Sequence, residues 1–325
     1  MKTTRHILLD WAEQGRIASE NMPQALSLAG VFPSGSDWRR FLDHLLLWLG
    51  TLLVGVGVIF FFAYNWQDLG RFAKFGLVEG LLLMTLIVVW RFGLESLAGK
   101  AALLAASLFV GALLALVGQT YQTGADTFEL FAAWAMLILP WVLLARFAAL
   151  WVMWLLLLNV AAILYYQTFG GLFDLLFGTE QLIWVLFGLN TVALVVWESL
   201  AAKGIIWLRE RWAPRLLATG SGGLITTLAL YAVLGSYGNN GVALLVWGAW
   251  LAGAYWVYRH QAVDVYVLAG GVLSVIVIVT AFLGNIMLDS RAGAGGLLFI
   301  GLMVIGLSAA GGWWLKQVIN EVKSS

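Results

Sequence analysis

Long apolar runs alternate with short polar segments along almost the whole chain, and this pattern predicts membrane-spanning helices. A spanning helix needs about 20 mostly apolar residues, and ten runs come close to that length. Arg146 and Phe147 separate the fourth and fifth runs, which together are far too long for one crossing. The predicted fold is therefore an all-α, polytopic transmembrane helix bundle of about ten spans. The spans lie near residues 45–64, 72–90, 101–118, 130–145, 148–166, 181–199, 213–234, 242–258, 263–284 and 296–315.

The chain divides into a short N-terminal cytoplasmic helical region, residues 1–43, and the transmembrane bundle, residues 44–325. The segment "TRHILLDWAEQG" places Leu8 and Trp11 at helical spacing. Ser36 is positioned to cap a helix that continues into the membrane. Two interpretations of residues 1–43 stay open: a solvated cap on the bundle, or a docking module for a protein partner.

Composition makes lipid the solvent for most of the chain. Of the 325 residues, 62% are hydrophobic and 11% are charged, against about 45–50% and about 25% in soluble domains. The chain has no cysteine, which excludes disulfides, thiolate metal sites and thiol nucleophiles. Its three histidines, at positions 6, 44 and 260, are too scattered for a metal cluster. We therefore expect no enzymatic activity, no cofactor and no metal, and a net charge of +1 favours no nucleic-acid partner.

The distribution of positive charge predicts the orientation. Cytoplasmic loops of membrane proteins carry most of the lysine and arginine. With the N-terminus inside, Arg71, Lys74 and Arg291 are the three of the 18 basic residues that fall in outer segments. Both termini are therefore expected in the cytoplasm. The inner segment 203–215 alternates apolar and basic residues, as expected of an interfacial helix held by anionic headgroups.

Two stretches carry a family resemblance. They are "LGTLLVGVGVIFFFAYNWQDLGRFAK", residues 49–74, and "GQTYQTGADTFELFAAWAMLILP", residues 118–140, both preceded by "LLDWAEQGRIASE". Together they resemble the bacterial membrane proteins catalogued as domain of unknown function 2157, over roughly the first 145 residues. The resemblance implies a location in the bacterial cytoplasmic (inner) membrane. It supplies no catalytic residues.

Glu79 is the ionisable residue that most needs an explanation, because charged groups in lipid are costly and usually functional. It lies near the midpoint between Arg71 and Arg91, which bracket the second span. One interpretation is a protonated or hydrogen-bonded acid that is buried among helices or reaches an outer water pocket. The other is a carboxylate that couples transport to a proton or cation.

Three further polar or helix-breaking residues lie inside the spans. Asn159 and Asn190 fall near the middle of consecutive antiparallel spans, so an interhelical hydrogen bond between them is expected; the alternative is contact with a polar substrate. Pro140 is expected to break the fourth span near its centre and to free a backbone carbonyl. Broken helices of this kind form ion and substrate sites in transporters, although proline kinks also occur in ordinary spans.

Polar and aromatic residues also gather at the outer ends of the first and third spans. The segments "YNWQDLGR" and "GQTYQTGADTFEL" fall on the same side of the membrane by the charge count. Two interpretations stay open: an outer-face functional cluster, or an interfacial loop of girdle and turn residues. The residues concerned are Tyr64, Asn65, Trp66, Asp68, Gln119, Tyr121, Gln122 and Asp126.

Two functions are compatible with this pattern. The first is a secondary carrier or permease for a small solute, in which two five-span halves are inverted and Glu79, Asn159, Asn190 and Pro140 line the path. The second is a non-transporting envelope protein, an assembly factor or the membrane anchor of a complex. Its contact surfaces with a protein partner would be residues 1–43 and the outer-face cluster.

Overall fold

The computed structural model describes residues 8, 11–29, 35–64, 70–122, 124–173, 179–235, 240–289 and 293–324. Every secondary-structure element within these ranges is helical, and ten helices are long and apolar enough to cross a membrane. The predicted all-α fold and the predicted number of spans are therefore confirmed. The ten helices are α3 (Gly35–Tyr64), α4 (Arg71–Phe92), α5 (Leu97–Tyr121), α6 (Thr127–Leu144), α7 (Ala148–Phe173), α8 (Thr179–Ala202), α9 (Trp212–Val233), α10 (Asn240–Trp256), α11 (Val265–Asp289) and α12 (Gly293–Ser324).

Within the described ranges, four short elements with assigned bounds accompany these helices. In the N-terminal region lie η1 (Ser19–Asn21) and α2 (Met22–Leu28), and further along lie η2 (Ile206–Arg209) and η3 (Val257–Gln261). Because η2 is a single 3₁₀ turn and α9 begins at Trp212, the interfacial helix expected over residues 203–215 is wrong. The segment η3 is a π-helical turn that directly continues α10.

A sharp reversal separates the fourth and fifth spans, as the sequence predicts. Helix α6 ends at Leu144 and α7 begins at Ala148. Between them Arg146 adopts a φ of 43°, in the left-handed region. A left-handed residue cannot continue a right-handed helix, so the chain turns back here instead of forming one long helix.

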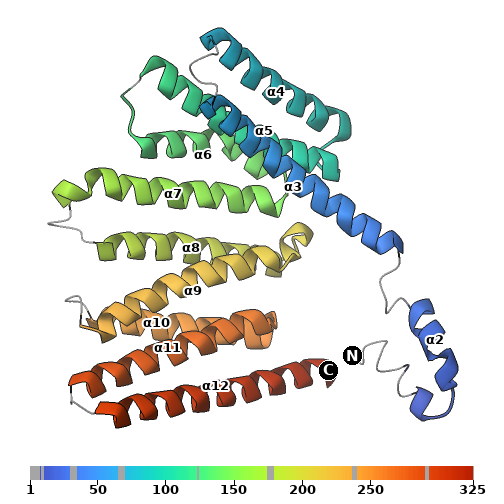
Figure 1. Ribbon diagram of the computed structural model, residues 1–325, viewed down its shortest axis with the longest axis vertical. Coiled ribbons are helices and arrows are strands. Elements are labelled where there is room, and N and C mark those ends of the chain that lie inside the picture. The colour runs from blue at the N-terminus through green and yellow to red at the C-terminus, as the bar shows by residue number, and fades with distance from the viewer. Residues whose placement is uncertain are drawn as a thin grey trace.

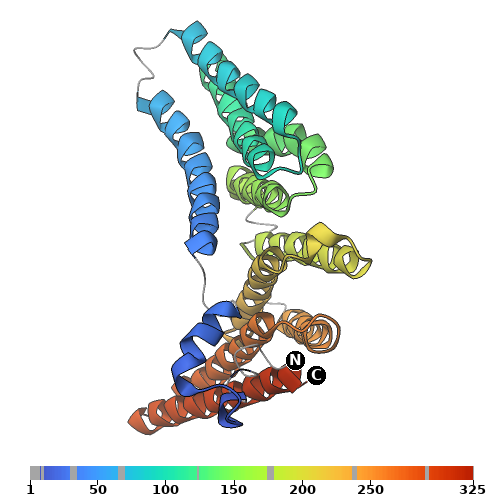
Figure 2. The ribbon, with the colours of Figure 1, turned by 90° about the vertical axis from the view of Figure 1, so that its right-hand side faces the viewer.

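The helices form an open row rather than a closed ring (Figure 1). Each pair of helices in extensive contact is at most two elements apart among α3 to α12. The two halves, α3–α7 and α8–α12, meet where α7 packs on α8 and α9. Turned by 90°, the row shows α3 standing off to one side (Figure 2), and its main packing partner is α5. The start of α3 and the end of α12 lie on the same side of the row, as an even number of spans requires (Figure 1).

Helices α5 and α9 are the packing centres of the two halves, and both present many small residues. Helix α5 packs on α3, α4 and α6, while α9 packs on α7, α8, α10 and α11. Small side chains let neighbouring helices approach closely in a membrane, where no hydrophobic effect drives helix association. The buried small residues are Gly99, Ala101, Ala102, Ala105, Ala106, Ser107 and Gly111 on α5, and Ala213, Ala218, Ser221, Ala229 and Ala232 on α9.

Candidate functional site

Glu79 lies on the exposed face of α4. Its neighbours Lys74 and Val78 are buried on the face that packs against α5. The interpretation of Glu79 as an acid buried among helices of this chain is therefore wrong. The structure also keeps Glu79 away from the two asparagines, because α4 has no extensive contact with α7 or α8.

Asn159 and Asn190 form the hydrogen bond that their matched depth predicts. The Nδ2 of Asn190 donates to the Oδ1 of Asn159 over 2.7 Å and thereby joins α7 to α8. Each amide also donates to the backbone carbonyl four residues earlier, that of Leu155 and that of Leu186. The bond therefore lies where the two halves of the chain meet.

Pro140 does not break its helix. Helix α6 continues past it to Leu144 without interruption. Pro140 also lies near the C-terminal end of α6 and not at its centre. The predicted helix break is wrong, because α6 stays helical on both sides of Pro140. A role for Pro140 in transport stays a prediction.

The outer-face cluster is described in part, since Asn65, Trp66 and Asp68 lie outside the described residues. Tyr64 is the last residue of α3 and is 90% exposed. The ring of Tyr121 lies 6.2 Å from the ring of Phe75 on α4. The remaining residues, Gln119, Gln122 and Asp126, lie at the end of α5 or just before α6. A functional role for this cluster stays a prediction.

A network of ionisable residues that the sequence did not reveal joins four helical elements at one end of the second half. Glu198 is at the end of α8, and Tyr258 is in η3. Arg211 donates through Nη1 to both carboxylate oxygens of Glu198 over 3.2 Å, and the hydroxyl of Tyr258 donates to the same carboxylate over 2.9 Å. Charge-assisted bonds of this kind are among the stronger interactions in proteins.

Asp264 extends this network to α11. Its side chain is 2% exposed and bridges two arginines, with the Nε of Arg215 at 2.9 Å and the Nε of Arg211 at 3.5 Å. One of its oxygens also accepts from the backbone N–H of Tyr266 in the first turn of α11. Asp264 therefore caps α11 and, through Arg215, also binds the first turn of α9.

Next to this network lies a cavity of 730 Å³, which we call the α8–α10 groove. It exists because α8 and α10 each pack on α9 without packing extensively on each other. A π-helical turn, a feature often found at functional sites, contributes Tyr258 to its wall. The full lining is Thr191, Leu194, Val195, Glu198, Ser199, Ala201, Ala202, Arg209, Arg211, Trp250, Gly253, Ala254, Trp256, Val257, Tyr258, Gln261 and Ala262.

The deep end of the groove is closed by hydrogen bonds between helices. The Nε1 of Trp250 on α10 donates to the hydroxyl of Ser221 on α9 over 2.8 Å. That hydroxyl lies 2.7 Å from the hydroxyl of Thr191 on α8. The three side chains hold the groove walls in register, and the indole N–H finds the partner that it needs inside a membrane.

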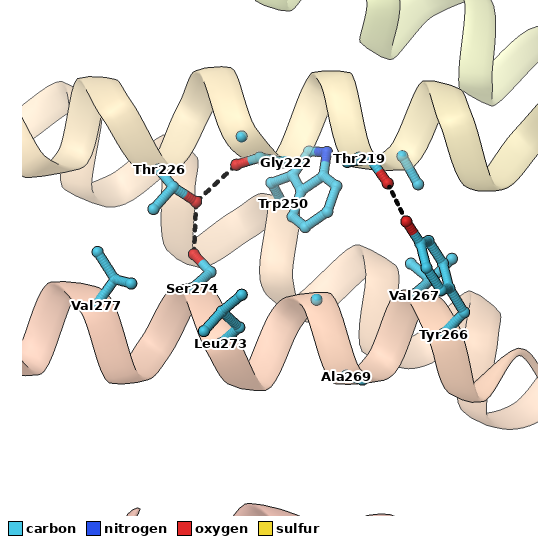
Figure 3. Close-up of a pocket in the computed structure, with 13 residues that line it drawn as sticks. Thr219, Gly222, Thr226, Trp250, Tyr266, Val267, Ala269, Leu273, Ser274 and Val277 are labelled. Atoms are coloured by element: carbon cyan, nitrogen blue, oxygen red, sulfur yellow. Dashed lines mark hydrogen bonds between the residues drawn. The ribbon is translucent and has the colours of Figure 1, made fainter. Parts of the chain in front are cut away.

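A second cavity, of 440 Å³, lies between α9 and α11 (Figure 3). Its polar groups bond to one another. The hydroxyl of Thr226 donates to the carbonyl of Gly222 and lies 2.6 Å from the hydroxyl of Ser274, while Thr219 lies 3.1 Å from the hydroxyl of Tyr266 (Figure 3). The residues that line it include no aspartate, glutamate, lysine, arginine or histidine. The α8–α10 groove is therefore the better candidate for a functional site.

Comparison with known proteins finds a family match in the first part of the chain. Residues 9–151 match the family model described as "Predicted membrane protein (DUF2157)". The resemblance stated from the sequence is thereby confirmed, over the region where it was expected. No curated protein and no solved structure matches the chain. The α8–α10 groove lies outside the matched residues, so the family description says nothing about it.

The chemistry available in the groove is acid–base and electrostatic. No group of three or more histidine, aspartate or glutamate residues with metal-binding geometry occurs within the described part of the chain. The groove offers a carboxylate, a phenol and guanidinium groups, with apolar walls. The sequence contains one signal for it, the run of Arg209, Arg211 and Arg215 soon after Glu198, but the partner Asp264 is 49 residues beyond Arg215.

Proposed function

We propose that this protein is a secondary carrier or permease for a small solute, and that the α8–α10 groove is its binding site on the cytoplasmic side. The observation that supports the proposal is the carboxylate of Glu198, which lines a groove of ligand size. Ionisable residues that face a cavity between spanning helices mark solute and ion pathways. The role that the sequence suggested for Glu79 moves to Glu198, because Glu79 faces away from the chain's own helices.

The geometry suggests how binding would be coupled to movement. A solute that donates a hydrogen bond to Glu198 competes with Arg211 and Tyr258 for the same two oxygens. Arg211 also contacts Asp264, so its release weakens the link from α8 to α11. The π-helical turn that carries Tyr258 holds one extra residue per turn and is a natural place for a change of helical register.

A binding screen tests the proposal. The purified protein is heated in detergent with a library of water-soluble metabolites, because any ligand of the folded state raises the unfolding temperature by mass action. We expect at least one solute to stabilise the wild type, Glu198→Gln to lose that effect and Glu79→Gln to keep it. Counterflow of that solute into proteoliposomes then measures transport. Equal uptake by Glu198→Gln and wild type would reject the assignment.

The second candidate, a non-transporting membrane anchor or assembly factor, is favoured by the position of Glu79. A carboxyl group exposed at mid-span is costly in lipid, and a helix of another protein could shield it. Cysteine cross-linking tests this, since the chain has no native cysteine. Leu83→Cys, on the exposed face of α4, should cross-link to a partner, whereas Leu82→Cys, on the face packed against α5, should not. A stoichiometric partner that is lost on deleting residues 1–34 would support the same function.

A further inference from the structure

The α8–α10 groove combines an apolar trough with a basic end, which is the shape of a site for a phosphate-headed lipid. Its apolar wall is formed by Leu194, Val195, Ala254, Trp256 and Val257. Its basic end is formed by Arg209 and Arg211. Basic pockets between spanning helices at the cytoplasmic side are known to bind anionic lipid headgroups.

The charge available to a ligand comes from Arg209. Arg211 is already used, since it donates to Glu198 and, through Nη2, to the carbonyl of Ala262 over 2.9 Å. The guanidinium of Arg209 makes no hydrogen bond or ion pair with another residue in the described part of the chain. The neighbouring carboxylate of Glu210 does not line the groove and accepts from the Nε1 of Trp212 over 3.0 Å. Because Glu198 and Arg211 neutralise each other, the groove presents one uncompensated positive charge.

The depth of the groove matches the geometry of a lipid. Arg209 ends η2, in the segment between two spans, where headgroup phosphates lie. From Ala202, the last residue of α8, the lining extends back to Thr191. At 1.5 Å per helical residue this is a depth of roughly 16 Å, about half of the hydrocarbon core. A headgroup at Arg209 therefore leaves its acyl chain beside the apolar wall.

The groove is also open to the surrounding membrane. Val195 on α8 and Trp256 on α10 line it and are 57% and 58% exposed. These two side chains lie within spanning helices, where lipid chains are the surrounding medium. A lipid can therefore enter from the side, with no need to pass through water.

We infer that the α8–α10 groove binds an anionic phospholipid, with its phosphate at Arg209 and an acyl chain along Leu194, Val195 and Ala254. The inference rests on the proposed function only in taking the groove as a ligand site, and it adds a lipid held at Arg209 to the water-soluble solute proposed at Glu198. In the Glu198–Arg211 ion pair, which has no net charge, the carboxylate would accept hydrogen bonds from the hydroxyl groups of a headgroup such as glycerol.

Binding is tested by adding phosphatidylglycerol, phosphatidylcholine or free glycerol phosphate to the full-length protein in detergent. The readouts are the unfolding temperature and the number of lipids retained in native mass spectrometry. We expect phosphatidylglycerol to bind more tightly than phosphatidylcholine, and Arg209→Gln to weaken phosphatidylglycerol about fivefold, the effect of one interfacial cation. Lys203→Gln is the matched control, because it removes an exposed cation from the same segment but not from the groove lining.

Three results would overturn the inference. These are equal binding of the two phospholipids, equal losses in Arg209→Gln and Lys203→Gln, and a stabilisation by glycerol phosphate as large as that by phosphatidylglycerol. The last would identify a water-soluble phosphate as the ligand. Failure of the carrier function is distinguishable, since lipid selectivity that depends on Arg209 without any solute flux leaves the lipid site standing. Solute flux that depends on Glu198, in a protein without lipid selectivity, would support the carrier function and overturn the lipid site.

Discussion

Asn190 donates a hydrogen bond of 2.7 Å to Asn159 and so links the last helix of the first half to the first helix of the second. The halves meet at α7, which packs on α8 and α9 and shares a buried apolar cluster with them, while the other helices in extensive contact pack within their own half. Asn159 and Asn190 supply a side-chain hydrogen bond at this junction. This amide pair is therefore a determinant of how the two halves are held together.

Removing one partner of the amide pair should destabilise the protein. Asn159→Leu leaves Asn190 without its interhelical acceptor, and interhelical hydrogen bonds in membranes contribute about 1 kcal/mol. We expect a lower unfolding temperature in detergent and faster proteolysis between α7 and α8. Asn285→Leu is the control, since its amide donates to a carbonyl within the second half, that of Val233. Increased cleavage between α7 and α8 in the control as well would show that the pair has no special role there.

The buried carboxylate of Asp264 should contribute more to the stability of the protein than the exposed charge of Glu210 nearby. Asp264→Asn keeps the acceptor that caps α11 but loses the charge that faces Arg211 and Arg215. Because hydrogen bonds to charged groups contribute about 1.5–3 kcal/mol, we expect a loss of about 2 kcal/mol in the free energy of unfolding.

The exposed Glu210 is the control for Asp264, and Glu210→Gln should leave the free energy of unfolding within about 0.5 kcal/mol of wild type. Detergent-unfolding titrations followed by helical circular dichroism measure both variants. If Asp264→Asn proved as stable as Glu210→Gln, the ionic network would contribute nothing measurable to the free energy of unfolding.

Two glycines of α5 should differ in how alanine at their position changes the stability of the protein. A Cβ at Gly111 would overlap the ring of Trp134 on α6, and that ring is held by a 2.7 Å hydrogen bond from its Nε1 to the carbonyl of Ser107. Overpacking of this kind costs about 1–3 kcal/mol, so Gly111→Ala should destabilise the protein. A Cβ at Gly118 meets no atom within 4 Å, and Gly118→Ala should be neutral or slightly stabilising because alanine favours the helix. The unfolding temperatures of the two variants test this: equal unfolding temperatures would contradict the predicted overlap at Gly111.

The sequence was sufficient for the number of spans, because spanning length and apolar composition are fixed by the bilayer and need no tertiary information. It also placed Asn159 opposite Asn190, because consecutive antiparallel spans bring equal depths together. It could not place Glu79, since lipid-facing and protein-facing sides of a span are both apolar and the pattern does not distinguish them.

The ionic network was missed for a different reason. Glu198, Arg211 and Asp264 each stand near the end of a span, where charged residues are expected at a lipid–water interface and suggest nothing further. Their proximity depends on α8 and α11 both packing on α9. Helix packing of this kind is decided by small differences in side-chain shape that hydropathy does not record. The same holds for the α8–α10 groove, which is a gap between two helices that share one neighbour.

The orientation of the spans decides on which side of the membrane the groove opens, and cysteine labelling in whole cells measures it most directly. Gln122 directly follows α5, and Ile206, which is 79% exposed, begins the turn that carries Arg209. The two variants are Gln122→Cys and Ile206→Cys. Each is the single cysteine of the chain. With a membrane-impermeant maleimide, we expect position 122 to react in intact cells and position 206 to react after permeabilisation alone. Reaction of position 206 in intact cells, with position 122 silent, would contradict the orientation and place the groove on the outer face.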